Sequence, residues 1–203
     1  MNTFIKLTDH VYILPYNPRN DRPIIVYVKG SNYSLLYDLG LGPKSTKILN
    51  KNIKDFNLAK PSKLILSHYH WDHSFASGYI KGELYSSTYT YNKLKEIIDM
   101  HIHDIDELIS DDIMPMFCKE HLHMEYKDVK DIKLRLPDKL IDEYTTFDLG
   151  DVKVDIIPTV SRHSDGSLLM LVDDLLFVGD ADSGEIRGFD FCHNPIKDES
   201  FIK

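Results

Sequence analysis

The feature that most constrains the fold is a group of metal-ligand side chains directly after a short apolar run. The run Leu-Ile-Leu, typical of a buried strand, leads straight into Ser-His-Tyr-His-Trp-Asp-His over residues 67–73. Imidazole nitrogens and carboxylate oxygens bind Zn²⁺ at about 2.0–2.2 Å. Alternate residues of an extended segment face the same side, so His68 and His70 can share one ion. A turn after His70 directs Asp72 and His73 to a neighbouring position, so the spacing predicts two metals side by side.

Apolar runs bounded by turn residues predict a chain built mainly from strands. Strands are expected at residues 11–15, 24–29, 34–38, 64–66, 83–86, 152–157, 168–172 and 175–178. Apolar residues in a polar background predict surface helices at about 44–56 and 89–100. Strands, then helices, then strands again predict an α/β (α+β) fold with a sheet-on-sheet core and helices outside.

A chain of 203 residues suits one domain, residues 1–203. Residues 101–145 are rich in Asp, His, Met and Ile with weak periodicity, and we interpret them as an inserted cap or lid segment. Two His-x-His pairs lie in this segment without a buried strand before them, so we expect solvated or lid side chains there. These histidines are His101, His103, His121 and His123.

The charge balance disfavours a nucleic-acid binder. The chain has 24 Lys and Arg against 32 Asp and Glu, a net charge of −8, whereas phosphate binding needs clustered basic side chains. Cys118 and Cys192 form no Cys-x-x-Cys pair, so we expect no disulfide framework. The N-terminus has no signal-peptide pattern, and no stretch approaches the ~20 apolar residues of a membrane span. We therefore expect a cytoplasmic protein with no membrane or nucleic-acid partner.

The pattern His-x-His-x-Asp-His resembles the motif of the metallo-β-lactamase-like hydrolases. Further residues match the same family in order along the chain. Asp38 in Tyr-Asp-Leu-Gly resembles its Asp-x-Gly strand end, and His163 resembles the histidine of its Pro-Gly-His segment. Asp180 in Val-Gly-Asp resembles its bridging aspartate. The match extends over residues 11–182, nearly the whole chain.

The resemblance implies a four-layer αββα sandwich of two mixed β-sheets flanked by helices, with the metal site at one edge of the sheets. It assigns His68, His70 and His163 to a first metal, Asp72 and His73 to a second, and Asp180 to a bridge between them. Asp38 would orient the ligand loop from behind, or it is simply a turn former at a strand end. Two divalent ions are implied, Zn foremost with Fe or Mn as alternatives, because His and Asp suit several metals.

Such a site implies a metal-dependent hydrolase. A metal-bound water loses its proton near neutral pH, and the hydroxide attacks a carbonyl or phosphoryl centre. Asp72 is expected also to orient the attacking water, which makes it the candidate catalytic side chain. The expected substrate is a small ester, thioester, lactone or amide, and no Gly-x-Ser-x-Gly motif indicates a serine nucleophile. The acidic chain argues against a nuclease of the family, and His70 argues against its flavin-linked di-iron members.

The chain departs from the family at two points. Arg162 stands where the family has Gly, and it is either an anion contact for substrate or a solvated side chain. The family's late Gly-His element is missing, since residues 181–203 contain a single histidine, His193, in a different context. Residues 198–200 resemble the first turn of a helix, so the C-terminal end is interpreted as incomplete.

Three interpretations of the missing last ligand stay open. The second metal binds weakly, or His193 replaces the ligand, or a partner chain completes the fold. A homo-oligomer is compatible with the sequence. The alternative to a hydrolase is a metal-binding protein of the same fold with little or no turnover.

Overall fold

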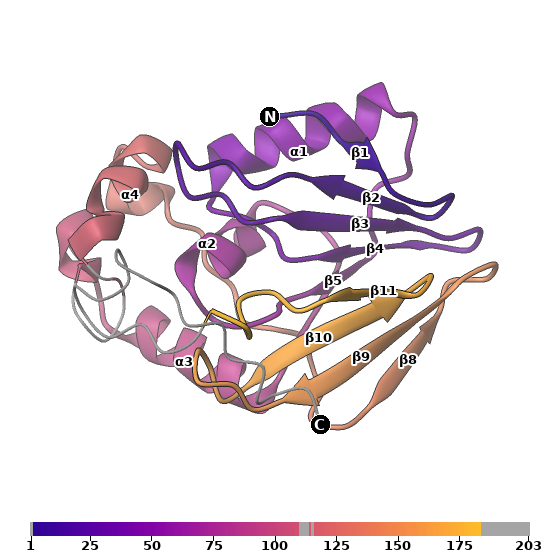
Figure 1. The fold of residues 1–203 in the computed structure, drawn as a ribbon. Coiled ribbons are helices and arrows are strands. Elements are labelled where there is room, and N and C mark those ends of the chain that lie inside the picture. The colour runs from indigo at the N-terminus through magenta and orange to yellow at the C-terminus, as the bar shows by residue number, and fades with distance from the viewer. Residues whose placement is uncertain (1, 110–113, 115, 184–203) are drawn as a thin grey trace.

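The computed structural model describes residues 2–109, 114 and 116–183 and contains two β-sheets (Figure 1). The first sheet has the strand order β1 (Ile5–Lys6), β2 (Val11–Leu14), β3 (Ile25–Lys29), β4 (Ser34–Tyr37), β5 (Lys63–Ile65), β6 (Glu83–Ser86), β7 (Lys139–Leu140). It is antiparallel from β1 to β4 and parallel from β4 to β7. The second sheet has the order β11 (Leu175–Phe177), β10 (Ser167–Val172), β9 (Lys153–Thr159), β8 (Thr145–Asp148).

Helices cover one face of the first sheet and one end of both sheets. The α-helices are α1 (Pro43–Asp55), α2 (Trp71–Ser74), α3 (Thr88–Asp99) and α4 (Lys119–Glu125). The 3-10 helices are η1 (Phe75–Gly78), η2 (Ile105–Leu108), η3 (Met116–Cys118) and η4 (Val129–Asp131). In Figure 1, α1 lies along the first sheet, and α2, α3 and α4 gather at one end of the sandwich. Every strand and helix expected from the sequence is confirmed to within two residues at each end.

Two apolar cores separate the layers, and β3 contributes to both. Ile25 and Tyr27 point to the core shared with α1 and α3, whereas Val26 and Val28 point to the core between the sheets. Successive residues of a strand face opposite sides, so a strand buried on both faces reads as a continuous apolar run. This explains the unbroken apolar character of residues 24–28 and confirms the predicted sheet-on-sheet core.

The second sheet differs in one respect from the predicted pair of mixed sheets. All three of its strand pairs are antiparallel, because β8 to β11 follow one another through short turns. Its outer face carries a small apolar cluster of Leu169, Ala181, Ile157 and Val178, and no helix contributes to it among the described residues. The described part of the α/β sandwich therefore has three layers, in the order helix, sheet, sheet.

The two sheets are joined by hydrogen bonds beside β10. Pro158 lies opposite Leu168 in the β9–β10 register. On the other side of β10, the Leu168 N–H donates to the Ser67 carbonyl at 2.8 Å and its carbonyl accepts from the Tyr37 hydroxyl at 2.6 Å. Burial raises the pKa of Tyr37 well above its usual value, so its hydroxyl keeps the donated proton. The end of β10 is therefore held against the metal-ligand loop that follows β5.

The described residues between 101 and 132 share an apolar cluster of their own. Leu108, Cys118, Leu122 and Tyr126 pack there with Trp71, which lies in α2. The Tyr126 hydroxyl also donates to the Leu41 carbonyl at 2.7 Å, next to the start of α1. The predicted cap segment is therefore shorter than residues 101–145. Its last part belongs to the first sheet, because β7 pairs with β6.

Within the described ranges, no helix has the length and apolar character needed to cross a membrane.

The Tyr37 hydrogen bond makes a testable contribution to stability. Tyr37→Phe leaves the buried Leu168 carbonyl without this donor, which should lower the free energy of unfolding by about 1–3 kcal/mol. Urea unfolding followed by circular dichroism measures the loss. Tyr144→Phe, at a side chain 62% exposed, is the control and should change stability by less than about 0.5 kcal/mol. Equal effects of the two substitutions would contradict the assignment.

The packing of residues 101–145 predicts an unreactive thiol at Cys118. The residue is buried, and burial raises its pKa to about 12, so little thiolate exists at neutral pH. In a Cys192→Ser background, an aromatic disulfide reagent should label Cys118 slowly in the folded protein and quickly in urea. Fast labelling of the folded protein would show that the segment is not packed as described.

Candidate metal centre

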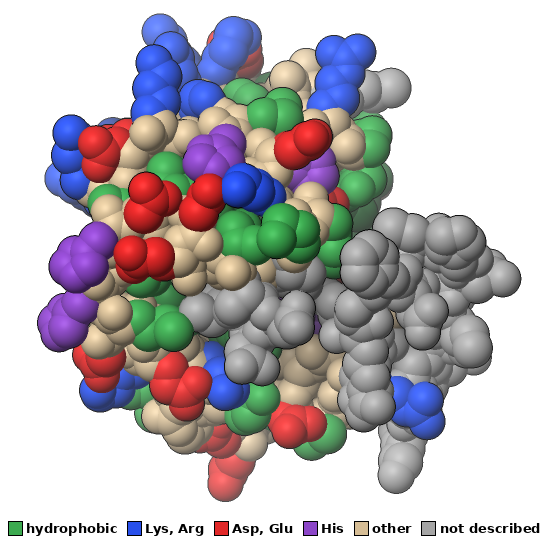
Figure 2. All heavy atoms as spheres, turned by 90° about the vertical axis from the view of Figure 1, so that its left-hand side faces the viewer, with side chains coloured by type: hydrophobic (Ala, Val, Ile, Leu, Met, Phe, Trp, Pro, Cys, Tyr) green, Lys and Arg blue, Asp and Glu red, His purple; other side chains and the backbone are tan. Residues whose placement is uncertain are grey.

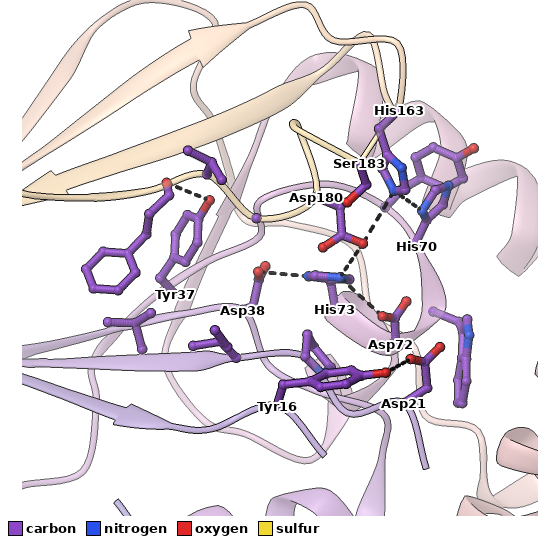
Figure 3. A pocket seen from close by; sticks show the side chains of 18 of the residues that line it. Tyr16, Asp21, Tyr37, Asp38, His70, Asp72, His73, His163, Asp180 and Ser183 are labelled. Carbon is purple, nitrogen blue, oxygen red and sulfur yellow. Dashed lines mark hydrogen bonds and ion pairs between the residues drawn. The ribbon is translucent and has the colours of Figure 1, made fainter. Parts of the chain in front are cut away.

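The predicted site residues meet at one edge of the two sheets. Asp38 follows β4, and residues 68–73 run from the end of β5 into α2. His163 lies between β9 and β10, and Asp180 lies just after β11. Figure 3 shows His73 between Asp38 on one side and Asp72 and Asp180 on the other. Four chain segments that are distant in sequence therefore bring their side chains to one place.

The buried carboxylate of Asp38 fixes the loop from behind. Its Oδ1 accepts the Ser67 N–H at 2.8 Å, and its Oδ2 lies 2.8 Å from His73 Nδ1. A carboxylate only accepts, so His73 Nδ1 carries the proton and Nε2 faces the opposite way. Asp38 has a positive φ of 60°, a left-handed conformation that Asp tolerates better than most residues. This contact supports the predicted orienting position over that of a simple turn former.

Three imidazoles converge on a single point. His68 Nε2 lies 2.9 Å from His70 Nδ1, and His163 Nε2 lies 3.2 Å and 2.9 Å from these two atoms. Nitrogens around a tetrahedral Zn²⁺ at about 2.0–2.1 Å are separated by roughly 3.3 Å. The three nitrogen–nitrogen distances are slightly shorter than that value and nearly equal, as expected of three ligands around one ion. His68 Nδ1 contacts the Ser67 hydroxyl at 3.0 Å, which leaves Nε2 to face the centre of the triangle.

The protonation state of His68 and His70 suits cation binding. Burial, and after it the neighbouring imidazoles, lower the pKa of His68 well below its usual value and that of His70 to about 3. Both rings are therefore neutral at physiological pH and offer a lone pair rather than a proton.

A second group surrounds His73 Nε2. This atom lies 3.2 Å from Asp72 Oδ2 and 3.5 Å from Asp180 Oδ2. Burial lowers the pKa of His73, but the charges of Asp72, Asp38 and Asp180 outweigh it and raise the pKa well above its usual value. Burial raises the pKa of Asp72, whereas His73 holds the pKa of Asp180 below its usual range despite burial. One imidazole ring faces three carboxyl groups, so negative charge predominates in this group.

Both groups fit a divalent cation. The nitrogens of His68, His70 and His163 lie close enough together to share an ion, and so do ligand atoms of His68, His73 and Asp180. His73 Nε2 is buried and has no hydrogen-bond partner among the described residues, as expected of an atom that binds a metal. Asp180 Oδ2 is also 3.6 Å from His163 Nε2, so it lies between the two groups, where a bridging ligand would lie.

A cavity of about 570 Å³ opens onto this site. Its walls include every predicted metal ligand except His68, together with Arg162 and, from the cap segment, Phe117 and Cys118. They also include Tyr16 and Asp21 from the β2–β3 loop, which lies between two of the predicted strands. No spacing or motif links that loop to the histidines, so the sequence contains no pattern that would have indicated Tyr16 or Asp21 as cavity residues.

The other histidines have different positions. His101, His103 and His123 are exposed, and His123 Nε2 contacts Asp106 at 2.6 Å on the surface of the cap segment. They belong to neither of the two groups, in line with the prediction of solvated side chains in this segment. The expected helix start at residues 198–200 and the substitute ligand His193 lie outside the described residues.

Solved structures with similar folds are metallo-β-lactamases. BJP-1, a subclass B3 enzyme of Bradyrhizobium japonicum, matches with a TM-score of 0.58 and 18% identity over 85% of this chain and 59% of that one. The enzyme of Pontibacter korlensis matches with a TM-score of 0.63 and 14% identity over 96% of this chain and 78% of that one. GOB-18 of Elizabethkingia meningoseptica matches with a TM-score of 0.57 and 13% identity over 86% and 58%.

At these identities the likeness concerns the fold alone, and the chain spans less than two thirds of the length of BJP-1 and GOB-18. No curated protein matches the sequence significantly. The family model described as the metallo-beta-lactamase superfamily matches residues 23–200, which is most of the chain. The protein therefore belongs to the metallo-beta-lactamase superfamily.

Proposed function

We propose that this member of a metallohydrolase superfamily is a binuclear hydrolase that acts on a small ester, thioester, lactone or amide. The observation that carries the proposal is the pair of adjacent ligand groups. Three imidazole nitrogens lie within 3.2 Å of one another, and the buried His73 Nε2 faces two carboxylates beside them. His68, His70 and His163 would hold the first ion, Asp72 and His73 the second, and Asp180 both. Zinc is the first choice for both ions, with iron or manganese as alternatives.

The protein's own side chains have separable tasks in such a reaction. A bound divalent ion supplies a Lewis acid and lowers the pKa of a water molecule. Asp72, only 15% exposed and facing the cavity, is placed to accept a hydrogen bond from the attacking water and to orient it. Asp38 keeps the proton of His73 on Nδ1, so that Nε2 would be free to bind the ion. Trp71 and Phe117 add apolar surface to the cavity wall, which would strengthen these electrostatic contacts by lowering the local dielectric constant.

The substrate is proposed to be a small molecule that enters the cavity under residues 101–145, with that segment as a lid. Figure 2 shows acidic side chains spread over one face and basic ones gathered mainly along its upper margin. The basic side chains form no continuous band across the face that is drawn. Together with the net charge of −8, this supports the proposal that nucleic acid is not a partner. A cytoplasmic location and a single domain, as a monomer or homo-oligomer, complete the proposal.

Metal content and turnover together test the proposed function. Purified protein should contain zinc, iron or manganese and should hydrolyse at least one member of an ester, thioester, lactone and amide panel. A chelator should abolish that activity, and Zn²⁺ should restore it. His163→Ala should lose the activity by at least about 100-fold, because an ion without one of its ligands is released or misplaced. His103→Ala, at an exposed histidine outside the site, is the matched control.

Two results would count against this proposal. Metal-loaded protein that is silent across the whole panel would favour the alternative, a metal-binding protein of the same fold without turnover. Protein that binds no divalent metal at all would contradict both candidates.

The Asp38 contact predicts a loss of metal affinity without loss of fold. In Asp38→Asn the side-chain carbonyl can still accept from Ser67 N–H, but the amide then donates toward His73 Nδ1. This arrangement favours the tautomer with its proton on Nε2, the atom that faces the metal position. We expect roughly 10- to 100-fold weaker binding of zinc, measured by competition with a chromogenic chelator. Unchanged affinity in Asp38→Asn would show that Asp38 does not orient His73.

A further inference from the structure

The core between the two sheets forms one wall of the cavity beside the metal centre. Val26 and Tyr37 are buried members of that core, Phe177 packs against it, and all three also line the cavity. They belong to β3, β4 and β11, so both sheets contribute to the same wall. The inter-sheet core therefore ends at the cavity on an apolar surface.

Ile24 extends this surface just before β3. It lines the cavity two residues before Val26, so the two side chains share the face of the chain that looks toward the second sheet. Val26 is buried, whereas Ile24 is 45% exposed. Apolar surface that stays exposed at the rim of a cavity is typical of a place where a ligand binds. We refer to Ile24, Val26, Tyr37 and Phe177 as the apolar wall.

The chain just before Ile24 is held in place by Arg22. This side chain is fully buried, and its guanidinium donates to the Pro15 carbonyl at 2.8 Å and to Asn2 Oδ1 at 2.9 Å. The Asn17 N–H donates to the Arg22 carbonyl at 3.0 Å, which closes the β2–β3 loop on itself. The position of Ile24 is therefore fixed before a ligand arrives, and a preformed surface loses little conformational entropy on binding.

The apolar wall adjoins the metal centre through two of its own strands. Tyr37 is followed by Asp38, whose Oδ2 lies 2.8 Å from His73 Nδ1. The Tyr37 hydroxyl also lies 3.5 Å from the carbonyl of Phe177, which stands three residues before Asp180. Figure 3 shows Tyr37, Asp38 and His73 one after another along the pocket. A substrate that reacts at the metal centre therefore has the wall beside its reacting bond.

The cavity offers this part of a substrate space but no matching charge. Its volume of about 570 Å³ lies within the roughly 300–1,000 Å³ of small-molecule sites. Histidines aside, the charged side chains of its described lining are Asp21, Asp38, Asp72, Asp180 and Arg162. A charged group against the apolar wall would lose its water without gaining an opposite charge from the wall, which is unfavourable. An uncharged hydrocarbon group suits the wall instead.

We propose that the apolar wall binds an uncharged aliphatic chain, several carbons long, that the substrate carries next to its reacting carbonyl. The inference rests on the proposed hydrolase function and adds the substrate class to it. Water adds across the acyl bond and releases the carboxylic acid and the alcohol, thiol or amine, while the chain itself is unchanged. Each methylene buried against the wall should strengthen binding by a factor of about four.

Two substrate series of the bond class that the protein hydrolyses test the inference. One compares acetyl with hexanoyl on the same leaving group, and the other compares ethyl with hexyl as the leaving group of the acetyl compound; in a lactone the ring carries the chain. The longer chain should raise kcat/KM by at least about tenfold in one of the series, because it places four more methylenes on the wall. The series that responds shows on which side of the carbonyl the chain lies.

A charged chain of the same length separates apolar binding from length alone. The six-carbon chain is replaced by one that ends in a carboxylate, such as adipoyl in place of hexanoyl. Its kcat/KM should fall at least about tenfold below that of the uncharged chain, because the wall cannot compensate the charge.

Ile24→Asn assigns the preference to the wall. The side chain is half exposed, so the substitution should leave the fold intact. The ratio of kcat/KM for the long chain to that for the short one should fall about fivefold or more, and Ile24→Leu should keep the ratio. Ile5→Asn is the matched control, since Ile5 is 42% exposed and lies in β1 outside the described cavity lining. A ratio within one protein is independent of how much of it is folded and metal-loaded.

Each outcome decides between the claims. A chain-length preference that the terminal carboxylate removes, and that Ile24→Asn but not Ile5→Asn reduces, supports the inference. Equal kcat/KM for short and long chains in both series overturns it and leaves the proposed hydrolase intact. So does a carboxylate-ended chain that is hydrolysed as well as the uncharged one, or a ratio that Ile24→Asn leaves unchanged. Metal-loaded protein that hydrolyses no member overturns the proposed function, and the inference falls with it.

Discussion

The carboxylate of Asp38 is the contact on which the rest of the site depends. It accepts from the backbone of Ser67 with one oxygen and contacts the His73 ring with the other, so it fixes both ends of the ligand loop at once. The Ser67 carbonyl then accepts from Leu168, which fastens the second sheet to the same loop. His163 precedes β10 and Asp180 follows β11, so their places relative to His68 and His70 follow from that junction.

A site of this kind concentrates buried charge, and the charge explains its need for a cation. Asp38, Asp72 and Asp180 surround a single imidazole, while burial drives His68 and His70 of the other group toward neutrality. Removing carboxylates from water is unfavourable unless a positive charge compensates them. One half of the site therefore offers lone pairs and the other half negative charge, and both are properties of metal ligands.

Much of this arrangement could be predicted from the sequence, because local spacing encodes it. The run from His68 to His73 follows a buried strand, and the strand pattern of residues 24–28 requires a core on both faces. Asp38, His163 and Asp180 were predictable from their order and their context at strand ends, and the structure brings all three to the ligand loop. That they bind metal stays a prediction.

The remaining features depend on contacts between segments that carry no shared pattern. Asp21 lies in a turn whose orientation is set by the buried guanidinium of Arg22, and nothing in its neighbours indicates a cavity. Phe117 and Cys118 reach the site because the cap segment packs on Trp71. The antiparallel second sheet follows from its short turns, where two mixed sheets were expected.

The presence of metal at the predicted position can be tested by anomalous diffraction at the zinc absorption edge from crystals grown with Zn²⁺. The account predicts a peak about 2.0–2.2 Å from His68 Nε2, His70 Nδ1 and His163 Nε2, with a second beside His73 Nε2. Ordered ligand side chains with no peak among the three imidazoles would contradict it.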